Sequence, residues 1–491
     1  MLAVSVDGNR KHYRFKSASR SEEPAIFDGV FLANDNDVAN FVNYVHSKAK
    51  HVSGRGICGG EWSAARETSR KSASKLDEEG LELAVCRHGV LLCALNMYRG
   101  EIFAYPLYLQ QKVTNSTFFC MDVTCKYWPY LKKVSKHCPE LQALLSMKPF
   151  LSVFHAKAHD FKCEVKWSGA YQEGAGLTLG EEVEQVNAFL SRIAVTTKHM
   201  SKAGRSDMLT LMAIRWNDHK FENLAGSLSR RYLKTIKMLD EKEKMLESTK
   251  NELLLTEVQL KDWVADVKEW AESATTPTDE DALESKIEGL VASIKRRTQH
   301  LYKDTDGCKA RARVRRKLRE EKRMLCTLIE EYNTLSSSAE ALCIDTILRE
   351  DVAWPWQDNQ NDHVTIRTKR QVFDQVMGVR RLQEEKKILV AEMAKHWNYL
   401  LARFGWLKEH SDRVSKLPLQ NTQDVLTDEA LNGMQALLKK KLWNIRQKIQ
   451  DVRHCYLSIF TGAECDFLQM TSDFPDSDLD SDLDSDLDDM Y

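Results

Sequence analysis

The sequence contains no signal for export or for a membrane span. It has no secretory apolar segment, and its longest apolar stretch, Leu81–Tyr98, is interrupted by Arg87 and His88. Its twelve cysteines include no C-x-x-C pair. We therefore expect reduced thiols, a cytosolic or nuclear protein and no membrane partner.

Nucleotide-binding signatures are also scarce. The chain has no P-loop, which argues against a motor driven by a nucleoside triphosphate. Gly54–Gly59 matches G-x-G-x-x-G, but no apolar strand precedes it and no βαβ unit follows it. We interpret this motif as a surface loop and expect no nucleotide cofactor.

Charge is distributed unevenly along the 491 residues. The last twenty residues hold nine Asp and no Lys or Arg, so removing their nine negative charges from the net charge of −1 leaves +8 on the rest. A mildly basic body is compatible with nucleic acid. Residues 461–491 are predicted to be a disordered acidic tail, either an interaction segment or a solubilising end.

Residues 1–220 have the pattern of an α/β domain. We predict a strand at Leu2–Val6 with a hairpin partner at Tyr13–Lys16, and a polar insert at about 17–80. Leu81–Leu95 predicts core strand, and Glu101–Leu109 a strand or short helix. These elements favour a mixed sheet with helices on its faces.

Residues 221–460 differ in kind and predict an all-α region. No proline lies between Pro149 and Pro277, and apolar residues recur at seven-residue spacing. This spacing favours one long helix with a narrow seam, partly coiled coil, which packs as hairpins or pairs with a second copy of the chain. The residues that form this seven-residue apolar column are Tyr232, Leu239, Leu246, Leu253, Leu260 and Val267.

A basic run occurs within the helical region. Lys309–Arg319 carries seven positive residues in eleven. One interpretation is a solvated helix face, and the other is contact with a DNA backbone or a nuclear-import signal.

Three carboxylates have the sequence context expected of ligands in a metal-dependent nuclease. The apolar run Phe118–Met121 leads into Asp122, and the first strand leads into Asp7. A Gly-rich loop then leads into Glu181, which opens a helix, and Glu184 lies on the same face. Two Asp at strand ends and a Glu on a later helix suit an RNase H-like fold whose carboxylates hold two Mg²⁺ ions.

A second group of ligand-type residues follows Asp122. His155, His159 and Cys163 are spaced by four residues, so a single helix would project all three from one side. With Cys125 they could bind one zinc ion. In the alternative interpretation, the two His hydrogen-bond around the acidic site and Cys163 packs as a small apolar group.

Several motifs occur in an order that resembles a known family. They are D-G-N at Asp7, C-R-H-G at Cys86–Gly89, G-E before Y-P-L at Gly100–Leu107, D-V-T-C at Asp122–Cys125, H-A-K-A-H at His155–His159, and G-A-G-L before G-E-E-V-E at Gly174–Glu184. This set resembles the Kyakuja–Dileera–Zisupton (KDZ) transposases over roughly residues 1–235.

The resemblance implies an RNase H-like DDE core that cuts and pastes DNA in the nucleus with two Mg²⁺ or Mn²⁺ ions. It implies Asp7, Asp122 and Glu181 as the metal ligands, with Glu184 as the rival third ligand. Such proteins usually carry an N-terminal cysteine cluster, whereas this chain begins six residues before Asp7. Two expectations follow: a truncated gene model, or a copy without its targeting module that is inactive or domesticated. The alternative function is a non-enzymatic coiled-coil scaffold.

Overall fold

The computed structural model describes most of the chain. It covers residues 1–18, 21, 23–49, 75–157, 159, 161–272, 308–335, 341–349, 366–416, 427–460 and 466–469, with scattered residues between 283 and 298. Gly54–Gly59, and all of the predicted acidic tail except residues 466–469, lie outside the described residues. The chain divides into two compact units, Met1–Asp218 with Glu241–Arg381, and His219–Asp240 with Leu382–Tyr491. The region predicted as one helical domain, 221–460, is thus shared between them.

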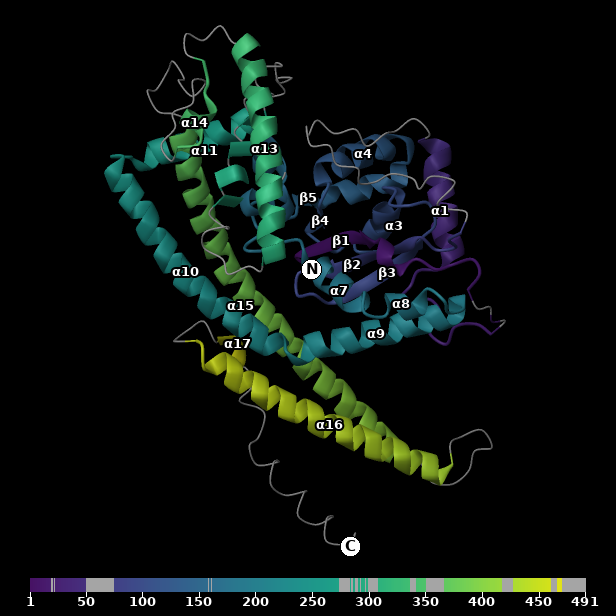
Figure 1. Ribbon diagram of the computed structural model, residues 1–491. Coiled ribbons are helices and arrows are strands. Elements are labelled where there is room, and N and C mark those ends of the chain that lie inside the picture. Colours follow the sequence, from purple (N-terminus) through teal and green to yellow (C-terminus); the bar gives the residue numbers. More distant parts are fainter. Residues whose placement is uncertain are drawn as a thin grey trace. The chain divides into compact units, whose positions relative to one another are not determined.

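The first unit contains a five-stranded mixed sheet in the order β3-β2-β1-β4-β5 (Figure 1). Strands β1, β2 and β3 pair antiparallel, whereas β4 and β5 run parallel to β1. The predicted RNase H-like α/β sheet is confirmed, with β1 at its centre. The strands are β1 (Ala3–Asn9), β2 (Gly80–Cys86), β3 (Leu91–Met97), β4 (Phe118–Met121) and β5 (Lys148–Leu151).

The hairpin partner predicted for the first strand was wrong. The side chain of Asn9 accepts a hydrogen bond from the backbone of Lys11, which turns the chain into a 3-10 helix, η1 (Arg10–His12). Tyr13–Lys16 pairs instead with residues 75–78, through an isolated bridge from Phe15 to Leu76 and backbone hydrogen bonds of Arg14 and Lys16. The antiparallel partner of β1 is β2, which lies beyond the polar insert.

Helices cover both faces of the sheet. Helices α1 (Asp35–Lys48), α3 (Ala104–Lys112) and α4 (Thr124–His137) share one apolar core with Val4, Val6 and other strand residues. Helices α7 (Glu182–Leu190) and α9 (Lys202–Glu222) pack on the other face against Leu81, Leu83 and Val85. The shorter elements are η2 (Pro139–Ser146), α5 (Val153–Ala156), α6 (Phe161–Trp167), η3 (Gly169–Tyr171) and α8 (Ala194–Thr197).

The rest of the described chain is helical, as predicted. No described helix combines the length and the apolar character needed to cross a membrane. The helices are α10 (Leu224–Glu252), α11 (Glu257–Glu272), α13 (Cys308–Leu335), α14 (Ile344–Ile347), α15 (Ile366–Ser415), α16 (Asp428–Leu457) and α17 (Asp466–Gln469). Within the predicted tail, α17 buries Leu468 among the apolar residues of the second unit.

The seven-residue apolar column does not lie on one helix, which corrects that expectation. Helix α10 ends at Glu252, and Leu254 adopts a φ of 51° that breaks the helix. Thr256 and Gln259 then form a capping box: each side chain accepts a hydrogen bond from the other residue's backbone N–H, at 3.0 and 3.3 Å. This box starts α11.

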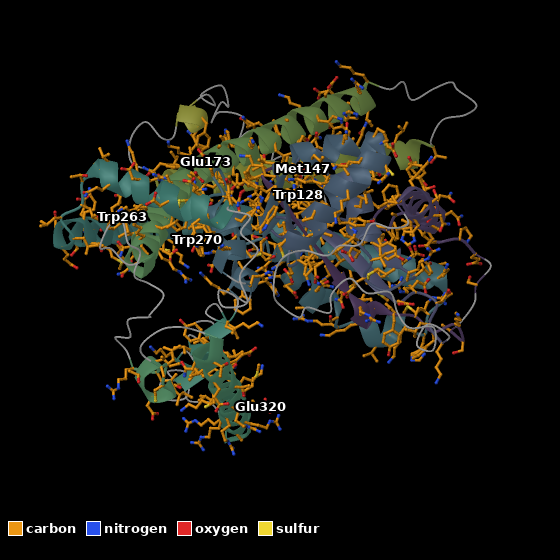
Figure 2. All side chains as sticks on the ribbon, turned by 90° about the horizontal axis from the view of Figure 1, so that it is seen from above. Trp128, Met147, Glu173, Trp263, Trp270 and Glu320 are labelled. Carbon is orange, nitrogen blue, oxygen red and sulfur yellow. The ribbon has the colours of Figure 1, made fainter. Side chains whose placement is uncertain are left out.

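Each unit has helical packing of its own. In the first, Trp263 on α11 is buried with Val165 of α6 and Phe373 of α15. Trp270, also on α11, is exposed, with the Lys162 ammonium 5.0 Å from its ring centroid (Trp270 is labelled in Figure 2). In the second, residues of α10, α15 and α16 bury Tyr232, Trp397 and Tyr456.

His12 is an unusual buried residue just after β1. Its side chain is fully buried, and neither ring nitrogen has a hydrogen-bond partner in the described structure. Burial lowers the pKa of His12 from 6.5 to about 4, and the neighbouring positive charges of Arg205 and Lys11 act in the same direction. The folded protein therefore holds this imidazole neutral.

We predict that His12 makes the fold acid-sensitive. Because its folded pKa is below its unfolded pKa, its contribution is complete above pH 6.5 and is lost as the pH falls toward about 4. The shift corresponds to about 3 kcal/mol of unfolding free energy. Denaturant unfolding of wild type and His12→Phe across pH 4–7 measures this contribution, because other titrating groups cancel in the comparison. A constant difference between the two proteins would contradict it.

Candidate metal-binding active site

The parallel pairing of β1 with β4 brings the two aspartates to one edge of the sheet. Ser5 is the partner of Cys120 in this register, so Asp7 and Asp122 follow their pairing residues by two positions each. Parallel strands carry equivalent positions to the same height. The prediction that these two strands are neighbours is confirmed, although β1 continues past Asp7 to Asn9.

Asp7 faces helix α7. The side-chain amide of Asn187 donates a hydrogen bond of 3.0 Å to Oδ2 of Asp7. Burial raises the pKa of Asp7 well above its ordinary value, and repulsion from Asp122 and Glu184 adds to the rise. Asp7 therefore gains from any cation that replaces its lost hydration.

Asp122 is held by two residues that follow β5. The hydroxyl of Ser152 lies 2.7 Å from Oδ1 of Asp122 and 3.0 Å from the carbonyl of Gly180, so its one hydrogen can serve either oxygen. His155 Nε2 lies 3.1 Å from Oδ2 of Asp122. Both carboxylate oxygens thus have fixed neighbours, while the side chain remains partly exposed.

The two candidate glutamates interact electrostatically with different aspartates. Glu181 caps α7, and its carboxylate accepts a hydrogen bond from the backbone N–H of Phe154. Burial raises the pKa of Glu181, and repulsion from Asp122 acts in the same direction. Glu184, one turn later and exposed, adds to the repulsion felt by Asp7. Each glutamate therefore lies within electrostatic reach of one candidate aspartate.

The carboxylates lie in one region, but their oxygen atoms do not converge on a single point. Among the described residues, one set of three His, Cys, Asp or Glu ligands has its ligand atoms within 4.8 Å of one another, and it contains none of these acids. Like charges repel when no cation lies between them. The roles of Asp7, Asp122, Glu181 and Glu184 as metal ligands therefore stay a prediction.

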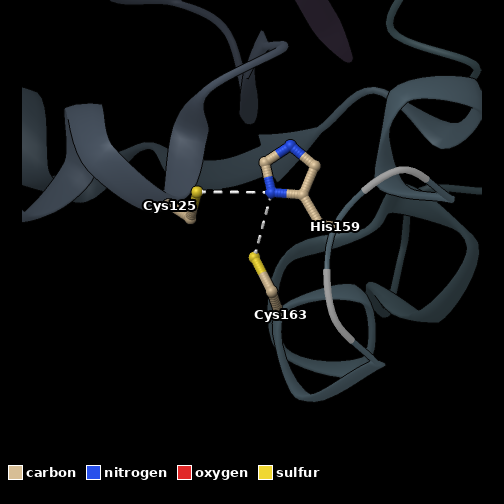
Figure 3. Close-up of side chains that lie close together, drawn as sticks. All are labelled: Cys125, His159 and Cys163. Atoms are coloured by element: carbon tan, nitrogen blue, oxygen red, sulfur yellow. Dashed lines mark hydrogen bonds between the residues drawn. The ribbon is translucent and has the colours of Figure 1, made fainter. Parts of the chain in front are cut away.

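That closely spaced set is Cys125, His159 and Cys163 (Figure 3). Nδ1 of His159 lies 3.6 Å from the sulfur of Cys125 and 3.5 Å from the sulfur of Cys163. Both cysteines are buried and His159 is partly exposed. Two thiols and an imidazole are ligands that zinc prefers, so the donor set fits this ion.

The expectation that one helix carries His155, His159 and Cys163 was wrong. Helix α5 ends at Ala156 and α6 begins at Phe161, so His159 lies in the connection between them. The three metal-type ligands still meet, because α4 supplies Cys125 and α6 supplies Cys163. His155 points instead to Asp122.

Gly180 allows the segment before Glu181 to pass close to the sheet. Its φ of +76° is unfavourable for other residues. A Cβ on Gly180 would also lie 2.7 Å from the ring of Phe150 and 3.1 Å from Cβ of Cys120. The loop that positions Glu181 therefore requires glycine for two separate reasons.

Several residues of the site were not foreseen from sequence. Asn187 hydrogen-bonds Asp7, and Ser152 hydrogen-bonds Asp122. Repulsion from Glu101 contributes to the raised pKa of both Asp7 and Glu82. Asn187 lies four residues after Val183 and three before Leu190, on the buried face of α7, which is a signal that helical spacing could have provided.

Comparison with known families is consistent with this geometry. Residues 1–217 match the model of the Kyakuja-Dileera-Zisupton transposase family. Residues 1–217 are less than half of the 491-residue chain, and over this part the chain is similar to the KDZ transposases. The match contains all five strands and every candidate ligand described above. Neither a curated protein nor a solved structure matches the chain.

We predict that Gly180→Ala destabilises this chain more than Gly174→Ala does. Both glycines have positive φ, but a Cβ at Gly174 would meet nothing within 4 Å. Gly174→Ala should therefore cost the backbone strain alone, about 1–2 kcal/mol. Gly180→Ala should add about 1–3 kcal/mol of overpacking against Phe150 and Cys120. Denaturant unfolding measures both, and equal losses would contradict the close contact.

Proposed function

We propose that this chain, which is similar to the KDZ transposases over residues 1–217, is a transposase-derived enzyme that cuts and joins DNA. The observation that supports it most is the β1–β4 pairing, which brings Asp7 and Asp122 to one sheet edge beside the glutamates of α7. In hydrolysis, a water oxygen bonds to phosphorus and the bond to the 3′ oxygen breaks, which frees a 3′-hydroxyl. That hydroxyl then attacks a phosphodiester of target DNA: its oxygen bonds to phosphorus, the bond from phosphorus to the target strand's 3′ oxygen breaks, and that oxygen leaves as a new 3′-hydroxyl.

The residues present fit divalent cations. Carboxylates are the hard oxygen ligands that Mg²⁺ and Mn²⁺ prefer, and burial makes the charge of Asp7 costly unless a cation is near. Asp7, Asp122 and Glu181 or Glu184 would hold two ions. When bound, such ions lower the pKa of the attacking water and stabilise the leaving oxygen.

Neighbouring groups hold these ligands in place. Asn187 orients Asp7, Ser152 and His155 orient Asp122, and the Phe154 N–H orients Glu181. Fixed ligands favour a productive arrangement, because less conformational freedom is lost when the substrate binds. In this proposal the chain's contribution is preorganisation of an otherwise repulsive acidic site.

The proposal extends to partners and location. Helix α13 exposes Arg315, Arg316, Lys317 and Arg319 of the basic run. Such side chains bind a DNA backbone through phosphate charge rather than base sequence. We propose DNA as the substrate, the nucleus as the site of action, and self-association through the helical region.

Zinc at Cys125, His159 and Cys163 is a separate part of the proposal. Three protein ligands leave a fourth coordination position for water or another side chain. The ion would tie the start of α4, three residues after Asp122, to α6. We propose that it holds this edge of the sheet in shape.

The alternative is a non-enzymatic interaction protein that uses the transposase-like α/β core only as a scaffold. It accounts for carboxylates whose ligand atoms do not converge on one point. It predicts no cation-dependent stabilisation of the core and no DNA nicking.

We predict that Asp122→Asn abolishes Mg²⁺- or Mn²⁺-dependent nicking of DNA while the fold stays intact. Asn keeps the shape but removes the charge that binds the cation, and removal relieves repulsion on Asp7. Without metal, the Tm should therefore be unchanged or higher. The variant should also lose the stabilisation that Mg²⁺ gives the wild type.

Glu173→Gln is the matched control, because Glu173 is an exposed carboxylate in the same unit. Retained cleavage by Asp122→Asn would remove Asp122 from the active site. A marked fall of its Tm without metal would give the Ser152 and His155 contacts a structural role instead.

We predict stoichiometric zinc in the purified protein, retained by His155→Ala and lost from His159→Ala. The two histidines lie close in sequence, but only His159 approaches both sulfurs. Metal analysis of the three proteins measures this. Sub-stoichiometric zinc in the wild type, unaffected by His159→Ala, would leave these residues with packing roles only.

A further inference from the structure

A groove lies between helices α10 and α15 in the second unit. It has a volume of about 460 Å³. Leu239 and Val390 contribute apolar side chains to its lining, and other residues of α15 add one amide and two ammonium groups. The lining residues are Leu239, Gln383, Lys386, Lys387 and Val390. All five belong to the second unit, so the groove is a feature of that unit alone.

The part of α10 that adjoins the groove is both apolar and basic. Leu233 and Ile236, three residues apart, are 51% and 39% exposed. Ile236 precedes Leu239 by three residues, so this exposed apolar surface continues from the wall of the groove. From Arg230 to Leu239 the helix carries four positive side chains and no acidic one. An apolar surface with a positively charged border suits a segment that is apolar and acidic.

Helix α17 brings the C-terminal segment of the chain close to this surface. Phe467 of α17 packs against Phe460, with ring centroids 5.9 Å apart, and Phe460 packs against Tyr232 of α10 at 5.1 Å. Leu239 lies seven residues after Tyr232, roughly 10 Å along the helix. Residues 470–491, which are outside the described residues, therefore begin within reach of the groove.

The sequence of this segment complements the groove. From Asp476 to Leu487 the unit D-S-D-L occurs three times in succession, so every leucine has an aspartate on both sides. Leu479 follows Gln469 by ten residues, and ten residues of extended chain span up to roughly 33 Å. Aspartates alone would be attracted to any lysine, whereas regularly spaced leucines gain only where apolar surface is also exposed.

We propose that residues 476–489 of the acidic tail dock in the α10–α15 groove of their own chain. The leucines cover the apolar part of the groove and of the adjoining α10 surface. The aspartates lie against the four lysines of this surface, which are Lys234, Lys237, Lys386 and Lys387. The docked segment thus neutralises a basic surface within the chain. This inference does not depend on the proposed function, because no candidate metal ligand takes part in it.

Zero-length carbodiimide cross-linking of the full chain, read by mass spectrometry, tests the docking. At low salt, amide links should join aspartates of the tail to the four lysines, in monomeric species and with a yield that does not depend on protein concentration. The yield should fall steeply at about 1 M NaCl, where the Debye length is about 3 Å. The absence of such links at low salt would overturn the proposal. Links confined to cross-linked dimers would also overturn it, because the groove would then hold the tail of a second copy.

Substitution of the leucines separates docking in the groove from attraction between charges. The triple variant Leu479→Ser, Leu483→Ser and Leu487→Ser keeps every aspartate and lysine, yet the yield of these links should fall several-fold. The matched control replaces the three intervening serines, and it should cross-link as the wild type does; its changes are Ser477→Ala, Ser481→Ala and Ser485→Ala. A wild-type yield in the leucine variant would overturn the proposal, because charge alone would then account for the links.

Two pairs of lysine variants test the location. Lys386→Gln with Lys387→Gln should reduce the links that reach the α10 lysines several-fold, because the groove loses two positive charges. Lys439→Gln with Lys440→Gln removes the same charge from exposed lysines of α16 in the same unit, and it should leave those links unchanged. Circular dichroism verifies that each variant is folded. Equal effects of the two pairs would overturn the assignment of the tail to this groove.

Discussion

Repulsion among the carboxylates at the end of β1 is the constraint on this site, and the neighbouring residues partly offset it. The β1–β4 pairing makes this crowding unavoidable, because it carries two acids to one sheet edge while α7 adds two more. Hydrogen bonds from Asn187, Ser152 and the Phe154 N–H compensate part of the lost hydration. Ser152 and Phe154 belong to the start of α5 and Asn187 to α7, so the acidic group links the sheet, α5 and α7.

Much of the sheet could be predicted because its signals are local. Phe118–Met121 is a short apolar run that ends at a charge, and the structure has that strand at those residues. The apolar spacing of Val183, Val186 and Leu190 marked the buried face of α7. Signals of this kind depend on burial, which hydrophobicity reports directly.

Pairing partners and helix ends were harder to predict. Tyr13–Lys16 was chosen as a partner because it is close in sequence, whereas β2 lies beyond a long insert and every residue of β2 is buried. The heptad column hid the break between α10 and α11, although Thr256 and Gln259 carry the spacing of a capping box. A local cap can therefore end one helix and start the next while the seven-residue spacing of apolar residues continues in the sequence.

The candidate site was predictable in composition more than in geometry. Ligand types and spacing indicated Cys125, His159 and Cys163, but not that His159 lies between two short helices. Likewise, helical spacing placed Glu181 and Glu184 on one face, yet hydrogen bonding turns Glu181 toward Phe154. Such choices depend on tertiary contacts, which a single sequence does not contain.

The central position of β1 also has a consequence for biosynthesis. β1 precedes all of its partners in the chain, yet both of its edges are paired, with β2 on one side and β4 on the other. During synthesis its apolar residues, such as Val4 and Val6, stay uncovered until residues beyond 121 have left the ribosome. Non-local pairings of this kind fold slowly and leave strand edges open to other chains. The nascent chain therefore carries an unpaired edge of β1, open to wrong pairing, over the interval between its first strand and its fourth.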